Sequence, residues 1–149
     1  MLKKEMILAQ VKEHVNRRIQ DAEIAMEAAQ NSANEDTKSS AGDKFETSRA
    51  MAMIDRNLYA RQKHEAELDM NVLHTILTDN VAETVSLGSL VKTNIGMFYI
   101  SISLGMMEIE GQKVMVTAIQ SPIGEAIKGL KKGDSVPFRG QKISILALA

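Results

Sequence analysis

The sequence predicts an α+β protein in which an N-terminal antiparallel coiled-coil helical hairpin precedes a small antiparallel β-sheet domain with one short helix. Three observations predict this order. Apolar residues recur every three or four positions in the first part of the chain, a polar stretch interrupts them, and a two-residue period follows later. We place the domain boundary at residue 80, giving domains at 1–80 and 81–149. A chain of 149 residues can hold one compact domain with an extended appendage.

The first helix is predicted from a single apolar stripe near the N-terminus. The positions between the stripe residues are largely charged, so this helix has one seam to bury and needs a partner helix. The stripe consists of Leu8, Val11, Val15, Ile19, Ala22, Met26 and Ala29.

A second helix is predicted after a polar break. Residues 31–42 are polar, small and without a period, which is typical of a loop or a frayed helix end. Two helices of about 30 residues would make an antiparallel hairpin on the order of 45 Å long. The seam of the second helix is expected to run through Met51, Ile54, Leu58, Leu68 and Val72, with Arg61 and Glu65 interrupting it.

The second half of the chain has the alternation of half-buried strands. Phe98, Ile100 and Ile102 alternate with polar or amphipathic neighbours, which indicates a strand. Ser121 and Pro122 form a serine N-cap and a first-turn proline, so a short helix is expected over 121–127. Four or five strands are expected around this helix, with further candidates at 89–93, 113–118, 134–138 and 142–148.

Composition excludes several classes of function. The formal net charge is −1, which disfavours autonomous binding to free DNA. No apolar run reaches the roughly 18 residues needed to cross a bilayer, so we expect a cytoplasmic protein without membrane contact. The chain has no cysteine, which removes disulfides, thiolate metal sites and cysteine nucleophiles. Three phenylalanines and two tyrosines, with no tryptophan, provide no base-stacking platform.

Two motifs carry a resemblance to a known family. One is GDKFE, residues 42–46, at the expected hairpin tip near 31–47, and the other is SPIGEAIKG, residues 121–129, followed by KGDSV, residues 132–136. With the order and lengths of the two halves, these motifs resemble the Gre family of bacterial transcription elongation and transcript-cleavage factors. That family joins a coiled-coil hairpin to a C-terminal domain of FKBP-like fold.

The resemblance implies an accessory factor with no catalytic centre of its own. Its partner would be RNA polymerase, entered through the secondary channel, with Ser121 and Pro122 contributing to the binding. Asp43 and Glu46 would position a magnesium ion and a water beside the polymerase active centre, so that the polymerase hydrolyses the 3′ end of backtracked RNA. Residues three apart on a helix can present two carboxylates to one cation. The Mg²⁺ would be shared with the polymerase, and the isolated chain would hold no metal or cofactor stably.

Other readings remain open from the sequence. Lys44 lies between the two acids, which favours a regulator that occupies the channel without stimulating cleavage. Asp43 and Glu46 also suit the start of a helix, where carboxylates interact favourably with free backbone N–H groups. A third possibility is a coiled-coil adaptor that associates through its hairpin. A prolyl isomerase is disfavoured because the aromatic-lined pocket of FKBP proteins has no counterpart in this sequence. A histidine metal site is disfavoured because His14, His64 and His74 lack the spacing of metal ligands.

Overall fold

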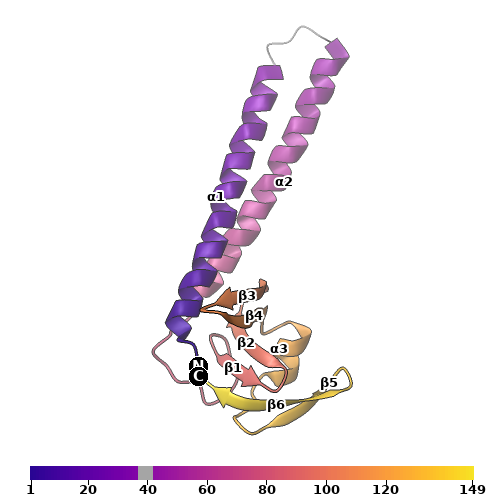
Figure 1. Cartoon of the computed structure of the whole chain (residues 1–149). Helices are drawn as coiled ribbons and strands as arrows, with labels where there is room; N and C mark the ends of the chain where they lie inside the picture. Colours follow the sequence, from indigo (N-terminus) through magenta and orange to yellow (C-terminus); the bar gives the residue numbers. More distant parts are fainter. Residues whose placement is uncertain (37–41) are drawn as a thin grey trace. The chain divides into compact units, whose positions relative to one another are not determined.

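The computed structural model describes residues 1–36 and 42–149, and of residues 36 and 42–45 only the backbone (Figure 1). The described chain forms two compact units, one of Lys12–Asn71 and one of Met1–Val11 with Val72–Ala149. The elements are α1 (Lys4–Asp36), α2 (Gly42–His74), β1 (Leu90–Thr93), β2 (Gly96–Ser101), β3 (Gly105–Ile109), β4 (Gln112–Ala118), α3 (Pro122–Ile127), β5 (Ser135–Phe138) and β6 (Gln141–Leu148).

The predicted fold class is confirmed, because a helical hairpin is followed by a β-sheet with one short helix. The apolar stripe of α1 is also confirmed as its buried side. Val11 and Val15 are fully buried and Ala22 is 5% exposed. Ala33, which is 1% exposed, extends the buried side beyond the last residue of the predicted stripe.

The predicted seam of α2 is wrong. Leu58 and Leu68 are 45% and 50% exposed, whereas Ala52 and Ala66 on the same helix are buried. All seven residues of the predicted seam are exposed, including Arg61 and Glu65. Small side chains let two helix backbones approach closely, so the alanine side of α2 is buried and the larger apolar side chains remain outside.

Two ion pairs connect α1 and α2 within the unit Lys12–Asn71. Arg18 Nη1 lies 3.0 Å from Asp69 Oδ2, and Lys63 Nζ lies 3.3 Å from Glu23 Oε1. The later residue of α1 is paired with the earlier residue of α2, as an antiparallel arrangement requires. All four side chains are about a third exposed or more, so these pairs fix the register of the helices more than they stabilise the hairpin.

The sheet has six strands in the order β3-β4-β2-β1-β6-β5. It is mixed, because β2 and β4 run parallel, where the sequence indicated antiparallel pairs throughout. Strand β3 was not predicted. It lies at one edge of the sheet, and its central residues Met106 and Met107 are unbranched and lack the β-branched or aromatic character typical of strands.

Two tight turns close the hairpins at the two edges of the sheet. Glu110 and Gly111 join β3 to β4 with φ of 50° and 76°, and Arg139 and Gly140 join β5 to β6 with φ of 48° and 79°. Positive φ at both central residues is the type I′ geometry that matches the twist of paired strands. The guanidinium of Arg139 lies 5.0 Å from the centre of the Phe138 ring, a cation–π distance.

Both faces of the central sheet are covered. One face carries an apolar core that includes Val91, Phe98, Ile100 and Ile143, and α3 contributes Ile127 to it. Tyr99 points to the opposite face, because successive side chains of a strand alternate, and it is fully buried as well. The compact unit of Met1–Val11 with Val72–Ala149, which we call the body, is therefore a sheet between two layers of side chains.

Candidate functional site

The predicted metal-positioning residues fall at the start of α2. Asp43 lies in the first turn of this helix, and its side chain is outside the part of the chain that the structure describes. Glu46 lies three residues later and is exposed. Residues three apart on a helix are neighbours on one face, so the described backbone is compatible with two carboxylates meeting one cation. Their role in positioning a metal stays a prediction.

Within the described residues, no group of three or more histidine, aspartate or glutamate side chains is arranged to hold a metal ion. His14, His64 and His74 are all exposed and lie on different parts of the two helices.

Ser121 caps α3 with a hydroxyl that is fully used. Its Oγ accepts a hydrogen bond from the Gly124 backbone N–H at 3.1 Å and another from Thr117 Oγ1 at 2.8 Å. The same hydroxyl donates to the Ala118 carbonyl at 2.7 Å. Pro122 follows at the first helical position and is exposed. The predicted helix start is therefore confirmed, while polymerase binding by these two residues stays a prediction.

Gly124 explains why the motif has a glycine inside a helix. A Cβ at this position would lie 2.3 Å from the Ala118 carbonyl oxygen and 2.7 Å from the Ile119 carbonyl oxygen. Real Cβ atoms do not approach backbone oxygens so closely. The close approach of α3 to the end of β4 therefore requires glycine. The SPIG segment, residues 121–124, thus has a structural role, which is to position α3.

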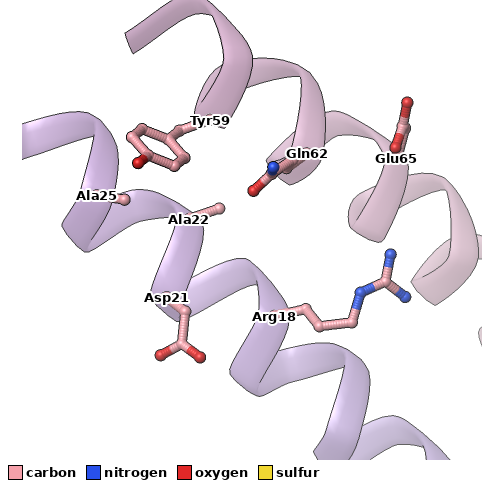
Figure 2. A pocket seen from close by; sticks show the side chains of 7 residues that line it. All are labelled: Arg18, Asp21, Ala22, Ala25, Tyr59, Gln62 and Glu65. Atoms are coloured by element: carbon pink, nitrogen blue, oxygen red, sulfur yellow. The ribbon is translucent and has the colours of Figure 1, made fainter. Parts of the chain in front are cut away.

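An open groove of about 500 Å³ lies between α1 and α2 (Figure 2). Ala22 and Ala25 form its floor on α1, because their short side chains leave space opposite Tyr59 and Gln62 of α2. Arg18 lies at one end and is held by Asp69. This groove was not predicted from the sequence, although paired alanines on one helix face are a signal for such a gap.

The body contains two buried polar atoms without a hydrogen-bond partner among the described residues, Tyr99 Oη and Ser101 Oγ. Burial raises the pKa of Tyr99 from its ordinary value of 10.0 to about 12, because the phenolate would be poorly solvated. The tyrosine is therefore neutral at physiological pH and acts as a core side chain with an unused hydroxyl.

Comparison with solved structures finds similar chains. One is GreA factor homolog 1 (Gfh1) of Thermus thermophilus, 16% identical, with a TM-score of 0.35 and coverage of 95% of this chain and 92% of that chain. The other is the transcription factor Gfh1, 18% identical, with a TM-score of 0.31 and coverage of 98% and 92%. No family model and no curated protein matches the sequence. Among the described helices, none is long and apolar enough to span a membrane.

Proposed function

We propose that this protein is an accessory factor that binds bacterial RNA polymerase and inserts its hairpin into the secondary channel. Its activity is stimulation of the polymerase's own hydrolysis of backtracked RNA, with no catalytic centre in this chain. The proposal rests on the resemblance of the GDKFE and SPIGEAIKG motifs to those of the Gre factors, together with the geometry of the hairpin.

The observation that carries the proposal is a long helical hairpin with acids where its two helices meet. Helices α1 and α2 contain 33 residues each. At 1.5 Å per residue each is about 50 Å long, which suits a probe that reaches a buried active centre through a narrow channel. Asp43 and Glu46 lie in the first two turns of α2, at the end where α1 stops and α2 begins.

The metal chemistry follows from how Mg²⁺ binds proteins. The ion requires oxygen ligands in near-octahedral geometry and keeps several waters, so two carboxylates on an isolated hairpin would hold it weakly. Carboxylates of the polymerase supply the remaining affinity. Asp43 and Glu46 would help to hold the ion and a water, and the ion would supply the chemistry of two-metal phosphodiester hydrolysis.

The body contributes the exposed Pro122 to the contact with polymerase. Proline on the surface presents a rigid apolar ring without a backbone donor. Because the Ser121 hydroxyl already has three partners in the chain, its part in binding is to hold Pro122 and the first turn of α3 in place.

A second candidate keeps the polymerase as partner and removes the cleavage. Arg49 is exposed and follows Glu46 by three residues, so a cation lies on the same helix face as the acid. Lys44 lies between the two acids in the sequence. Positive charge beside the carboxylates opposes metal capture and favours a regulator that only occupies the channel.

The deciding experiment is RNA cleavage in stalled, backtracked elongation complexes of the cognate polymerase. The natural sequence is compared with the double variant Asp43→Asn, Glu46→Gln. The matched control is Asp55→Asn, Glu67→Gln, which removes the same charge from α2 away from its first turns. Shortened transcripts with the natural sequence and the control, but not with the tip variant, are expected for a cleavage factor.

Binding to the polymerase is measured in parallel by native gel shift. Binding without cleavage by any variant would replace the cleavage proposal with the non-cleaving regulator. Absence of binding by the natural sequence would overturn both.

A further inference from the structure

The outer face of α2 presents large apolar side chains on both sides of two central charged residues. Met51, Ile54, Leu58 and Leu68 are 56%, 59%, 45% and 50% exposed, respectively. Single exposed apolar residues are common on protein surfaces, but a row of them along one helix face is typical of an interaction surface. This row lies opposite the buried alanine side of the same helix.

The spacing of this row is that of a coiled-coil seam. Positions 51, 54, 58, 61, 65, 68 and 72 alternate steps of three and four along α2, and all seven residues are exposed. We call these residues the outer seam. Arg61 and Glu65 occupy its middle, flanked by apolar residues on both sides: Met51, Ile54 and Leu58 before them, and Leu68 and Val72 after them.

The order of residue types in the outer seam is symmetric about position 63. Leu58 and Leu68 are equally far from this position, as are Ile54 and Val72. Arg61 and Glu65 are also equally far from it and carry opposite charges. A second α2 running in the opposite direction would therefore pair like with like at the apolar positions and opposite charges at the centre.

We propose that a second copy of this chain packs antiparallel along the outer seam of α2, forming a two-fold symmetric dimer. In an isologous interface each contact occurs twice, so Arg61 of each copy meets Glu65 of the other. A parallel copy would instead place arginine on arginine and glutamate on glutamate, which is unfavourable. The charges in the seam thus specify both the partner and its direction.

The central charges are free to make these contacts. Neither Arg61 nor Glu65 has an ion pair within the described part of the chain, whose four ion pairs involve other residues. Both side chains are exposed, although Glu65 also lines the edge of the groove between α1 and α2 (Figure 2). Both therefore remain accessible to a second copy.

The flanks of the outer seam are compatible with this pairing. Asp55 would lie near Asp69 of the second copy, and the charge of Asp69 is balanced by Arg18 at 3.0 Å in its own chain. Asn57 and Asn71 flank the other side without charge. From Met51 to Val72 the seam is about 30 Å long, which allows several layers of side chains to pack.

The test is the oligomeric state of the full chain by sedimentation velocity over an approximately thousandfold range of concentration. The natural sequence is expected to shift from monomer to dimer. Arg61→Glu or Glu65→Arg alone places like charges opposite each other and is expected to weaken dimerisation at least about tenfold. An equimolar mixture of the two variants is expected to regain dimerisation, because the two negative charges of one variant then face the two positive charges of the other.

The matched control is Arg17→Glu on α1, which reverses an exposed charge of the same hairpin outside the outer seam. It is expected to dimerise like the natural sequence. A natural sequence that stays monomeric throughout overturns the proposal. So do a mixture that fails to regain dimerisation and a control that loses it. Far-UV circular dichroism verifies that each variant keeps its helices.

The direction of packing is tested by cross-linking, which the lack of native cysteine makes clean. A short bis-maleimide is expected to join Leu58→Cys to Leu68→Cys in a mixture, because these positions face each other in the antiparallel dimer. Efficient cross-linking of Leu58→Cys to itself would indicate parallel packing and overturn the proposal. These assays contain no polymerase, so a failure here is distinct from a failure of the proposed function. Because the outer seam lies on the hairpin, the dimer has to dissociate before the hairpin enters the channel.

Discussion

At the residue scale, the body contains buried or half-buried hydroxyl groups of two kinds. Some make every hydrogen bond available to them, and others make none within the described part of the chain. Ser121 is of the first kind, with three hydrogen bonds through one hydroxyl. Tyr99 is of the second kind, fully buried with an Oη that has no hydrogen-bond partner in the described part of the chain. Loss of the hydroxyl is therefore expected to destabilise the protein at Ser121 and to have little effect at Tyr99.

Ser121→Ala is expected to lower the free energy of unfolding by about 1–2 kcal/mol, because it removes the cap of α3 and leaves the Thr117 hydroxyl with one partner fewer. Ser121→Thr keeps a hydroxyl and is expected to recover most of the loss. Urea unfolding of the three proteins measures this. Unchanged stability in Ser121→Ala, with loss of polymerase binding, would instead make Ser121 a direct contact.

Tyr99→Phe is expected to leave stability at neutral pH almost unchanged, because no hydrogen bond is lost. The natural sequence should lose stability as the pH rises from 10 to 12. The pKa of Tyr99 is about 12 in the folded chain and 10.0 ordinarily, so the unfolded chain releases its proton first. A difference of two pKa units corresponds to at most about 3 kcal/mol.

The measurement is urea unfolding at several alkaline pH values for both proteins. Lysines deprotonate in the same range, but they do so in both chains, and the difference between the two curves isolates Tyr99. Equal slopes in the natural sequence and Tyr99→Phe would contradict the assignment of the raised pKa to burial.

At the element scale, α2 has two seams with different residue types. Its inner side buries Ala52 and Ala66 within the hairpin, and its outer seam exposes larger residues such as Leu58 and Leu68. The inner seam is set by how closely two helix backbones approach. The outer seam is set by what a second molecule can cover.

Ala66→Leu is expected to destabilise the hairpin by about 1–3 kcal/mol, because a fully buried position has no room for a larger side chain. Leu68→Ala, two residues later, is expected to change stability by less than about 0.5 kcal/mol in dilute protein, where Leu68 is half exposed. Thermal unfolding followed by far-UV circular dichroism compares them. The reverse ranking would mean that the larger apolar residues face α1.

At the scale of the whole molecule, the body is not contiguous in sequence. The compact unit that contains the sheet also contains Met1–Val11 and begins again at Val72. Ile7 and Leu73 are fully buried although they belong to the two helices. The ends of the hairpin helices are thus part of the same compact unit as the six strands.

A fragment of residues 81–149, the C-terminal domain expected from the sequence, should be poorly folded alone because it lacks the helical residues of its unit. In the full chain, Ile7→Ala is expected to destabilise the body by about 2–5 kcal/mol. Ile24→Ala on the same helix is the control, since Ile24 is 67% exposed. Urea unfolding followed through the amide signals of the strands measures all three. A fragment with well-dispersed amide signals and cooperative unfolding would show that the body needs no residues of α1 and α2.

Much of the fold could be predicted from sequence because it is encoded by local periods and caps. The three-and-four stripe of α1, the alternation of β2 and the Ser-Pro start of α3 each specify an element through contacts within a few residues. The acids Asp43 and Glu46 and the motif around Ser121 were also recognisable as candidates from sequence. Their placement near a polymerase active centre remains a prediction, because it depends on a second molecule.

What only the tertiary structure decided is which neighbour covers each face. The apolar period of α2 identified a real apolar face, but α1 packs on the alanine side instead. A hydrophobic period reports that a face avoids water, whereas the partner that covers it depends on side-chain size and backbone approach. The parallel pairing of β2 with β4 could not be predicted for the same reason. An alternating pattern indicates a strand, but it does not indicate which strand pairs with it.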